Sequence, residues 1–438
     1  MLKSTLKTFG TRTASPEEVI RRAKPLAERY GVTRVSDITG LDRLRIPVTS
    51  AIVPRSDDFL SVYSGKGRRR DQAFAGAYME AIERQAFLRA RPPMIRVSAA
   101  VLRKEACIVE PTDIITILSE TWSEDSDYEW LKGFDLLSGE STWVPAAAAG
   151  YRWRHLTRGS PFRRTTTHGL AAGNCFEEAV SQALCELVER DAWTLAELAG
   201  YWWPSALAEC RLGRNPGADY LDDFERSPCI DFTGMDGGIE RLLGRLHRAG
   251  LRPVVRDISS DLGIPVVLAA VADDDVPGFP QAHMGVGAHP ELSVAAARAL
   301  TELAQSRCVD IQAMREDIAP AQGDGDATGI VVHTRRVQTI DRRRWLHHPS
   351  TETRAWQEIE QHRNADILRD IQLLLQRLTK AGISQVVAVD FSPPDSGLSV
   401  VRMIAPGLEM WIADHGRFGH RATRYWRSLR AQEETAYA

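Results

Sequence analysis

Two similar stretches, QAFAGAYMEAIER at residues 72–84 and EAVSQALCELVER at residues 178–190, each end in the pattern Glu-x-x-Glu-Arg. The three-residue spacing places both carboxylates of a pair on one side of a helix, one turn apart. The small and apolar residues before each pair predict helices that pack inside the protein. Because like charges on a packed helix repel and are costly to desolvate, we expect a cation against them. Two pairs together could hold more than one hard divalent cation, the usual partner of a nucleotide triphosphate.

The plainer interpretation of each acid pair is a salt bridge with the arginine that follows it. We favour metal or nucleotide binding, because the pattern occurs twice on similar helices and each helix follows a glycine-containing segment. The candidate metal ligands are Glu80, Glu83, Glu186 and Glu189.

The order of a strand, a glycine turn and a helix is predicted three times. The turns read SGKG at residues 64–67, GLAAGN at 169–174 and GVGAHP at 285–290. The third helix contains ALTELAQSR at 299–307, in which Gln305 replaces the second acid. Because the period is not constant, a solenoid is disfavoured. We therefore predict an α/β (α+β) fold with internally repeated units around one central site.

The chain shows no linker that divides it cleanly. We predict an N-terminal helical segment at residues 1–45, one large α/β catalytic domain at 46–415 and a polar C-terminal tail at 416–438. An amphipathic helix is predicted at about 355–380. Polar loops and strands are predicted at other positions. The loops are 151–166 and 318–328, and the strands include 46–53, 59–63, 141–146, 253–257, 264–271, 385–391 and 398–404.

Composition and charge exclude several classes of function. The 438 residues are 43% apolar with a net charge of −3, so no bulk charge calls for nucleic acid or an anionic membrane. No run reaches the ~18 apolar residues of a membrane span, and the N-terminus does not resemble a secretory signal. The six scattered cysteines lack CxxC pairs, which indicates reduced thiols. We expect a cytoplasmic protein that binds neither nucleic acid nor membrane.

The glycine segments are weaker signals when each is taken alone. In residues 64–67, backbone N–H groups and Lys66 could cradle phosphates, but the Walker A pattern is absent and a plain turn is the alternative. Asn174 and Glu177 could cap the second helix, a role that is compatible with ligand binding. Three histidines near these segments have no metal-binding spacing, so structural roles are favoured for them: His168, His283 and His289.

Taken together and in order, these motifs resemble the YcaO family. The resemblance covers about residues 10–415 and includes VRMIAPGLE at 401–409. It implies an enzyme that uses ATP and Mg²⁺ to phosphorylate the oxygen of a peptide backbone amide. It also implies that the four acids named above bind Mg²⁺, and it assigns no catalytic residue. The positions that it matches to the nucleotide site are Ser64, Lys66, Arg84, Asn174, Glu178, Arg190, Arg307 and Arg12.

The N-terminal region resembles one subgroup of that family. The sequences GTRTASPEE at residues 10–18 and VSDITGLDRLRIP at 35–47 look like members that act beside a TfuA-type partner and are linked to thioamide formation. Azoline-forming members typically end in a proline-rich tail, whereas this sequence ends in QEETAYA. We therefore expect thioamidation of a peptide or protein substrate with a TfuA-like partner. The family also implies a possible homodimer.

Two alternatives stay open. The first is an azoline-forming cyclodehydratase of ribosomal peptide natural products. The second is a non-catalytic scaffold that binds nucleotide or peptide and assists another modification enzyme, although the retention of all four acids argues against it. We also predict that the metals lie mainly between the first two helices, with the third helix completing the nucleotide pocket.

Overall fold

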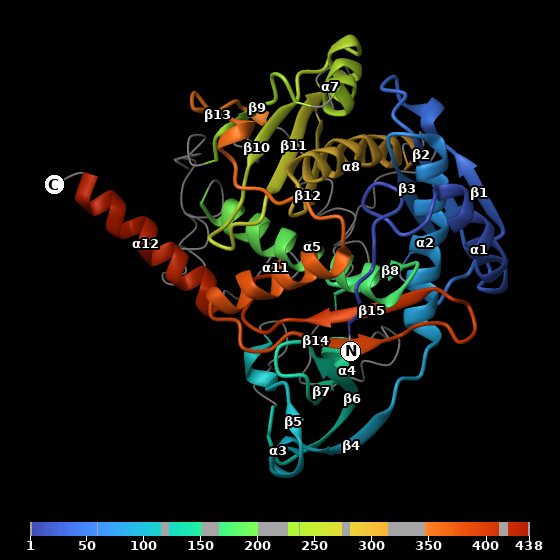
Figure 1. Ribbon diagram of the computed structural model, residues 1–438, viewed down its shortest axis with the longest axis vertical. Coiled ribbons are helices and arrows are strands. Elements are labelled where there is room, and N and C mark those ends of the chain that lie inside the picture. Colours follow the sequence, from blue (N-terminus) through green and yellow to red (C-terminus); the bar gives the residue numbers. More distant parts are fainter. Residues whose placement is uncertain are drawn as a thin grey trace, which may run out of the picture.

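The computed structural model shows a mixed α/β architecture, in which each β-sheet is packed against helices (Figure 1). The predicted fold class is thereby confirmed. No helix in the described part of the chain combines the length and the apolar character of a membrane span. The structure describes residues 2–58, 60–114, 122–150, 166–199, 227–235, 237–273, 281–313, 347–410 and 419–436.

The first unit is an antiparallel sheet with the strand order β1-β2-β3, covered by two helices. Its elements are α1 (Pro16–Arg29), β1 (Arg34–Asp37), the 3₁₀ turn η1 (Thr39–Leu41), β2 (Val48–Ile52), β3 (Val62–Lys66) and α2 (Arg70–Arg89). Helix α1 begins as expected, because the Ser15 side chain accepts a hydrogen bond from the Glu18 N–H and proline occupies the first position. The segment 1–45 is not purely helical, since β1 pairs with β2 across the predicted boundary at residue 45.

The second unit is a five-stranded sheet with the order β12-β11-β10-β9-β13. Helices α7 and α8 pack against each other, and α8 covers β11 and β12. The elements are β9 (Cys229–Asp231), α7 (Gly237–Arg248), β10 (Val254–Asp257), β11 (Val266–Asp273), β12 (Gln281–Ala288), α8 (Leu292–Ala313), β13 (Thr353–Ala355) and the 3₁₀ turn η7 (Trp356–Glu358).

The third unit is a seven-stranded sheet with the order β5-β7-β6-β14-β15-β8, and β4 pairs with β6 off this path. Its strands are β4 (Met94–Ser98), β5 (Cys107–Ile108), β6 (Asp127–Asp135), β7 (Ser141–Pro145), β8 (Leu170–Gly173), β14 (Val387–Asp390) and β15 (Ser399–Ile404). Its helices are α3 (Ala99–Glu105), the 3₁₀ turn η2 (Pro111–Asp113), α4 (Ala146–Ala149), α5 (Phe176–Glu197) and α11 (Ile367–Lys380). Helix α12 (His420–Ala436) follows and extends from the body in Figure 1.

The seven-stranded sheet lies between the two largest apolar clusters. Along β14, Val387 and Val389 belong to the cluster that includes α2, while Ala388 belongs to the cluster that includes α5 and α11. This alternation is the period of two that a strand imposes on its side chains. The central strands are therefore buried on both faces, and α2 and α5 pack against opposite faces of one sheet.

Three edge strands carry the glycines that were predicted to form turns. Gly65 lies in β3, Gly173 in β8 and Gly285 in β12, so these three glycines lie in strands, whereas Gly169 lies in a turn at positive φ just before β8. A Cβ on Gly65 would lie 2.0 Å from the Ala73 carbonyl oxygen, and one on Gly285 would lie 2.3 Å from the Ala299 oxygen. Glycine is required here because each strand approaches the backbone of the helix that follows it.

The three units close into a ring. Each of α2, α5 and α8 packs on the edge strand of its own unit, namely β3, β8 and β12. In addition, α2 contacts β8, α5 contacts β12 and α8 contacts β3. The three helices that carry the related sequence motifs therefore surround one centre, as the repeated motifs predict.

Some predicted boundaries are wrong. The amphipathic helix begins at Ile367 rather than near residue 355, because Asp366 caps it and the preceding residues form η7 and an extended segment. The N-cap of α5 is Cys175 rather than Asn174. The tail predicted at 416–438 contains α12. The predicted loops at 151–166 and 318–328 lie almost entirely or entirely outside the described residues, as does the boundary at 415.

Candidate active site

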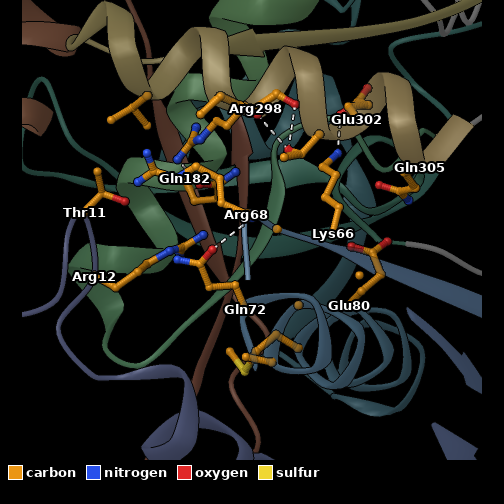
Figure 2. Close-up of a pocket in the computed structure, with 18 of the residues that line it drawn as sticks. Thr11, Arg12, Lys66, Arg68, Gln72, Glu80, Gln182, Arg298, Glu302 and Gln305 are labelled. Carbon is orange, nitrogen blue, oxygen red and sulfur yellow. Dashed lines mark hydrogen bonds and ion pairs between the residues drawn. The ribbon is translucent and has the colours of Figure 1, made fainter. Parts of the chain in front are cut away.

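A cavity of about 1820 Å³ lies inside the ring of α2, α5 and α8, and Figure 2 shows part of its lining. Its size exceeds the roughly 300–1,000 Å³ of a pocket for one drug-sized ligand. Eleven of the twelve residues predicted for metal or nucleotide binding line this cavity. They are Arg12, Ser64, Lys66, Glu80, Glu83, Arg84, Asn174, Glu178, Glu186, Glu189 and Arg190.

Arg307 is the exception among the predicted residues. Its Nε lies 3.0 Å from Oδ2 of Asp42, and only 4% of its side chain is exposed. Asp42 follows η1, so this ion pair ties the N-terminal segment to α8. The structure therefore places Arg307 at a contact between two units instead of among the described residues that line the cavity.

The two acid pairs face the strand β8 from α2 and from α5. Oε2 of Glu83 accepts a hydrogen bond from the Ala172 N–H at 2.9 Å. Oε2 of Glu186 accepts one from the Gly169 N–H at 3.1 Å. Glu83 and Glu186 come from different helices but are held to the same short segment of backbone, which places both pairs at one end of the cavity.

The electrostatics of these acids call for additional positive charge. Withdrawal from bulk water raises the pKa of all four, in opposition to the nearby arginines. For Glu83, the carboxylates of Glu80 and Glu186 raise the pKa further. For Glu189, burial raises the pKa to about 8 despite the neighbouring Arg190. A bound divalent cation would relieve both the desolvation and the mutual repulsion.

The spacing of the acids fits Mg²⁺ shared with a nucleotide better than a metal held by protein alone. Within the described residues, no group of three or more His, Cys, Asp or Glu side chains is arranged to hold one metal ion. Mg²⁺ usually takes one or two carboxylates and completes its shell with phosphate oxygens and water. Such a mode requires paired carboxylates beside a cavity large enough for a nucleotide, and both are present.

Arg190 links the acids of α5 to the cavity. Its Nη2 lies 3.4 Å from Glu189 and 3.7 Å from Glu186, and its guanidinium stacks on Trp193 with 5.2 Å between the guanidinium carbon and the ring centre. Its buried Nε has no hydrogen-bond partner among the described residues. Because a buried donor is normally paired, this atom suits a ligand acceptor.

Two further residues that line the cavity, Arg298 and Glu302, were not identified as ligand-binding from the sequence motifs. Arg298 on α8 donates to Gln182 on α5 at 2.7 Å and to the Ala288 carbonyl at 2.9 Å. Lys66 on β3 forms an ion pair with Glu302 on α8 (Figure 2). Both pairs cross from one unit of the ring to another, so sequence spacing gives no signal for them. The periodic position of Glu302 in the third motif was the only available clue.

Gln72 fixes the connection between β3 and α2. Its Oε1 accepts hydrogen bonds from the N–H groups of Arg68 at 3.0 Å and Arg69 at 3.2 Å. In Figure 2, Gln72, Arg68 and Arg12 lie on one side of the cavity, while Glu80 and Gln305 lie on another. The cavity therefore has a basic side and an acidic side, which suits a phosphate chain with its metal ions.

Arg84 lies on α2 one residue after Glu83 and is engaged with Asp58. Its Nε and Nη2 lie 2.8 Å and 2.9 Å from the two oxygens of Asp58 in a bidentate pair. The Asp58 side chain is fully buried. Sequence reasoning missed Asp58, because it lies in an irregular segment 26 residues before its partner. Arg84 thus lines the cavity while its fork is oriented by a carboxylate behind it.

The N-terminal segment covers the opposite end of the cavity through Glu178. This carboxylate accepts hydrogen bonds from Arg12 at 3.1 Å, from the Thr13 N–H at 3.0 Å and from the Asn174 amide at 3.0 Å. Although burial alone would raise it, the pKa of Glu178 is lowered because Arg12, Thr13 and Asn174 stabilise the charged form. Asn174 Oδ1 is buried without a partner among the described residues, so it remains available to a ligand.

The three candidate histidines lie outside the described lining of the cavity. Burial and the nearby charges of Arg190 and Arg402 hold the pKa of His168 well below its usual range, so it is neutral. Nδ1 of His289 accepts a hydrogen bond from the Glu291 N–H at 2.9 Å. His283 is buried in β12 beside Asp310. These placements agree with the structural roles favoured by the sequence.

Comparison with known proteins identifies relatives over almost the whole chain. A protein of Methanothermobacter thermautotrophicus (strain Delta H) that carries no functional name is 35% identical over 410 residues, or 93% of this chain and 97% of that protein. A Rhizobium leguminosarum bv. trifolii protein, described as lying in the tfuA 3′ region, is 32% identical over 92% of this chain and 90% of its own length.

Solved structures share the fold. YcaO from Methanopyrus kandleri, bound with AMPPCP and Mg²⁺, matches with a TM-score of 0.68 and 25% identity over 94% of this chain and 96% of that one. A heterocyclase in complex with substrate and cofactor matches with a TM-score of 0.73 at 22% identity over 93% of this chain. This chain spans 54% of that heterocyclase, so the likeness shows the fold alone.

The family assignment rests on a family model described as YcaO cyclodehydratase, ATP- and Mg²⁺-binding, which matches residues 64–409. The matched range begins at Ser64 in β3 and ends at Glu409, so it contains all three helices of the ring. ATP and Mg²⁺ are the cofactors that this family uses. The chain belongs to the YcaO family of ATP-dependent, peptide-modifying enzymes.

Proposed function

We propose that this enzyme converts a backbone amide of a peptide or protein into a thioamide, with a TfuA-like protein as its partner. The observation that carries the choice of product is the relative in the tfuA 3′ region, which is 32% identical over 92% of this chain. The likeness extends over 90% of that relative's own length, so it is not confined to one part of either protein. A cytoplasmic location, where ATP and reduced thiols are available, belongs to the same proposal.

We assign the four acids of α2 and α5 to hold Mg²⁺, and the basic side of the cavity to hold the phosphate chain. When bound, ATP supplies the phosphoryl group that makes an amide oxygen a good leaving group, and Mg²⁺ neutralises phosphate charge. Arg190 offers its unpaired Nε, and Asn174 offers its unpaired Oδ1. Lys66 provides a point charge, and Glu302 orients it. These residues bind and orient the reactants, while sulfide or a sulfur donor attacks the amide carbon.

The cavity is large enough for a nucleotide and a peptide segment together. Its volume of about 1820 Å³ is about twice the upper end of the roughly 300–1,000 Å³ range for one small ligand. Three exposed apolar side chains line this cavity, namely Leu60, Val62 and Val309. They give a peptide an apolar surface beside the phosphate-binding groups.

The test is the mass of the peptide product. Purified enzyme, the TfuA-like partner, Mg-ATP, a sulfide source and candidate peptides are incubated, and each peptide is analysed by mass spectrometry. Replacement of oxygen by sulfur is the expected change. Unmodified peptide with every candidate, under conditions in which the enzyme consumes ATP, would count against the assignment.

Azoline formation is the second candidate, and the cyclodehydratase description of the family model favours it. In that reaction an internal Cys, Ser or Thr side chain attacks the amide carbon, and the peptide loses water. The same experiment without sulfide separates the two products. ATP turnover distinguishes both enzymatic functions from a scaffold role, because a scaffold leaves ATP and peptide unchanged.

A further inference from the structure

Helix α5 presents two adjoining faces with different partners. Glu186, Glu189, Arg190 and Trp193 follow the spacing i, i+3, i+4, i+7 and line the cavity. The face that begins at Asp191 is rotated by about 100° from the position of Arg190, as for any two consecutive helical residues. This second face is covered by the C-terminal helix α12. Helix α5 therefore contacts both the cavity and α12.

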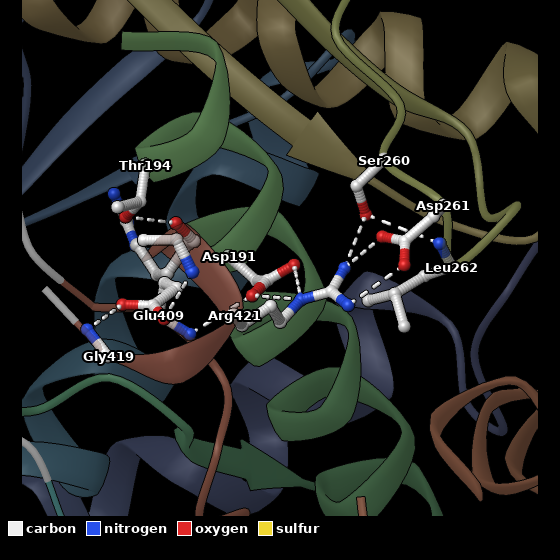
Figure 3. Close-up of polar contacts among 10 residues, drawn as sticks. Asp191, Thr194, Ser260, Asp261, Leu262, Glu409, Gly419 and Arg421 are labelled. Carbon is white, nitrogen blue, oxygen red and sulfur yellow. Dashed lines mark hydrogen bonds and ion pairs between the residues drawn. The ribbon is translucent and has the colours of Figure 1, made fainter. Parts of the chain in front are cut away.

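A buried polar network joins the two helices (Figure 3). The fully buried carboxylate of Asp191 accepts hydrogen bonds from Nε of Arg421 at 2.8 Å and from the Glu409 N–H at 3.0 Å. Nη1 of the same arginine donates to Asp261 at 3.0 Å, and Nη2 lies 3.4 Å from the hydroxyl of Ser260. One guanidinium on α12 thus connects α5 with the turn that follows β10.

The start of α12 is itself held in place. The carboxylate of Glu409 accepts hydrogen bonds from the N–H of Gly419 at 3.0 Å and from the N–H of Ala422 at 2.8 Å. These donors belong to the first turn of the helix, where N–H groups lack partners within the helix. An apolar cluster surrounds the network on this face of α5, formed by Leu195, Leu198, Ala422, Tyr425 and Trp426.

The network holds more acids than cations. Asp191 and Glu409 are fully buried, and Asp261 approaches from the protein surface. Arg421, which is 5% exposed, is the cation that contacts both Asp191 and Asp261. Loss of this guanidinium leaves the Asp191 carboxylate without its ion-pair partner in a buried position. A rotation or shift of helix α5 would hydrate that carboxylate, and Arg190 would move with the helix.

We propose that Arg421 is a positioning residue for the ATP site, because it fixes the rotation of α5 and thereby the direction of Glu186, Glu189 and Arg190. It acts through Asp191 and touches neither the nucleotide nor the substrate. The C-terminal helix is therefore a structural support of the cavity. This role rests on the binding of ATP and Mg²⁺, and it holds whether the product is a thioamide or an azoline.

The test compares nucleotide affinity with fold stability. Calorimetry gives the Kd for Mg-AMPPCP, and thermal unfolding without nucleotide gives the Tm. In Arg421→Lys the charge remains, but the fork that contacts Asp191 and Asp261 together is lost. We expect about a tenfold weaker Kd, the size typical when a residue that orients a ligand-binding group is replaced. An unchanged Kd with a lowered Tm would show a purely structural role and overturn the proposal.

A second variant keeps the test decisive if Arg421→Lys does not fold. Asp191→Asn combined with Arg421→Gln removes both partners of the ion pair, so Asp191 is not left as an unpaired buried charge, yet the link to Asp261 is lost. The proposal again expects weaker Mg-AMPPCP binding at a Tm near that of the parent. Arg424→Gln, an exposed position on the same helix, is the matched control and should bind as the parent does. Equal weakening in the control would refute a specific role for Arg421. Absence of binding to the parent protein would overturn the ATP assignment itself.

Discussion

Replacement of Gly65 by alanine tests the packing that closes the ring. The new Cβ would lie 2.0 Å from the Ala73 oxygen and 2.2 Å from the Ala77 nitrogen, whereas real Cβ atoms keep at least 3.0 Å from other heavy atoms. To restore that minimum separation, β3 must move away from α2 by about 1 Å. Both clashing atoms are backbone, so no side-chain rotation relieves the contact. Overpacking of this kind costs about 3 kcal/mol, the upper part of the usual range.

The assay is denaturant unfolding, with Gly244→Ala as the matched control. Gly244 lies inside α7, and its new Cβ would meet only the flexible end of Arg248 at 3.3 Å. Because alanine favours a helix, we expect this control to gain about 0.5–1 kcal/mol. Gly65→Ala should unfold at a clearly lower denaturant concentration and should bind Mg-AMPPCP more weakly, since β3 carries Ser64 and Lys66. Equal midpoints for Gly65→Ala and the parent would refute the close strand–helix packing.

Three further predictions concern the acids and the thiols. Glu186→Gln should raise the Mg²⁺ concentration needed for AMPPCP binding by about tenfold or more, measured by calorimetry, and an unchanged Mg²⁺ requirement would contradict the metal assignment. Because the folded-state pKa of Glu178 is lowered, its contribution to stability is present above its unfolded pKa and is lost as the pH falls, between about pH 5 and pH 2. In Arg12→Gln this acid-dependent loss should be smaller, and denaturation midpoints across that pH range that match those of the parent would contradict the ion pair. A thiol reagent should label the exposed Cys107 long before Cys308, whose pKa burial raises to about 12, and mass spectrometry of peptides would reveal the reverse order.

The repeated helices could be predicted from sequence because each carries its signal locally. The small side chains within 72–84 and 178–190 predict tightly packed helices. The Glu-x-x-Glu spacing predicts that both acids of a pair lie on one face of the helix. Both features are present in α2 and α5. The role of the glycines was misread for a physical reason. Glycine serves equally at a turn and at a close backbone contact, and only the position of the neighbouring helix distinguishes them.

The contacts that complete the site could not be predicted, since each joins residues far apart in the chain. Glu178 meets Arg12 across 166 positions, and Lys66 meets Glu302 across 236. Such contacts depend on how the three units close, which no local pattern encodes. Arg307 shows the opposite error. Its place in the third motif suggested a ligand contact, but a helix turns by about 100° per residue, and a displacement of one position moved its side chain away from the cavity toward Asp42.

The three helices of the ring differ in how their charge is balanced, and this difference bears on where the metals bind. The ion pair with Lys66 opposes the effect of burial and lowers the pKa of Glu302 on α8. By contrast, burial raises the pKa values of Glu83 and Glu189. Neighbouring acids raise the pKa of Glu83 further. The acids of α2 and α5 are therefore the ones whose negative charge is poorly compensated, and α8 contributes an acid that is already paired. A divalent cation gains most where this charge is concentrated, so we predict that the metals bind mainly between α2 and α5. Glu302→Gln should then weaken Mg²⁺ binding less than Glu186→Gln does, and the opposite order in calorimetric titrations would place the metals beside α8.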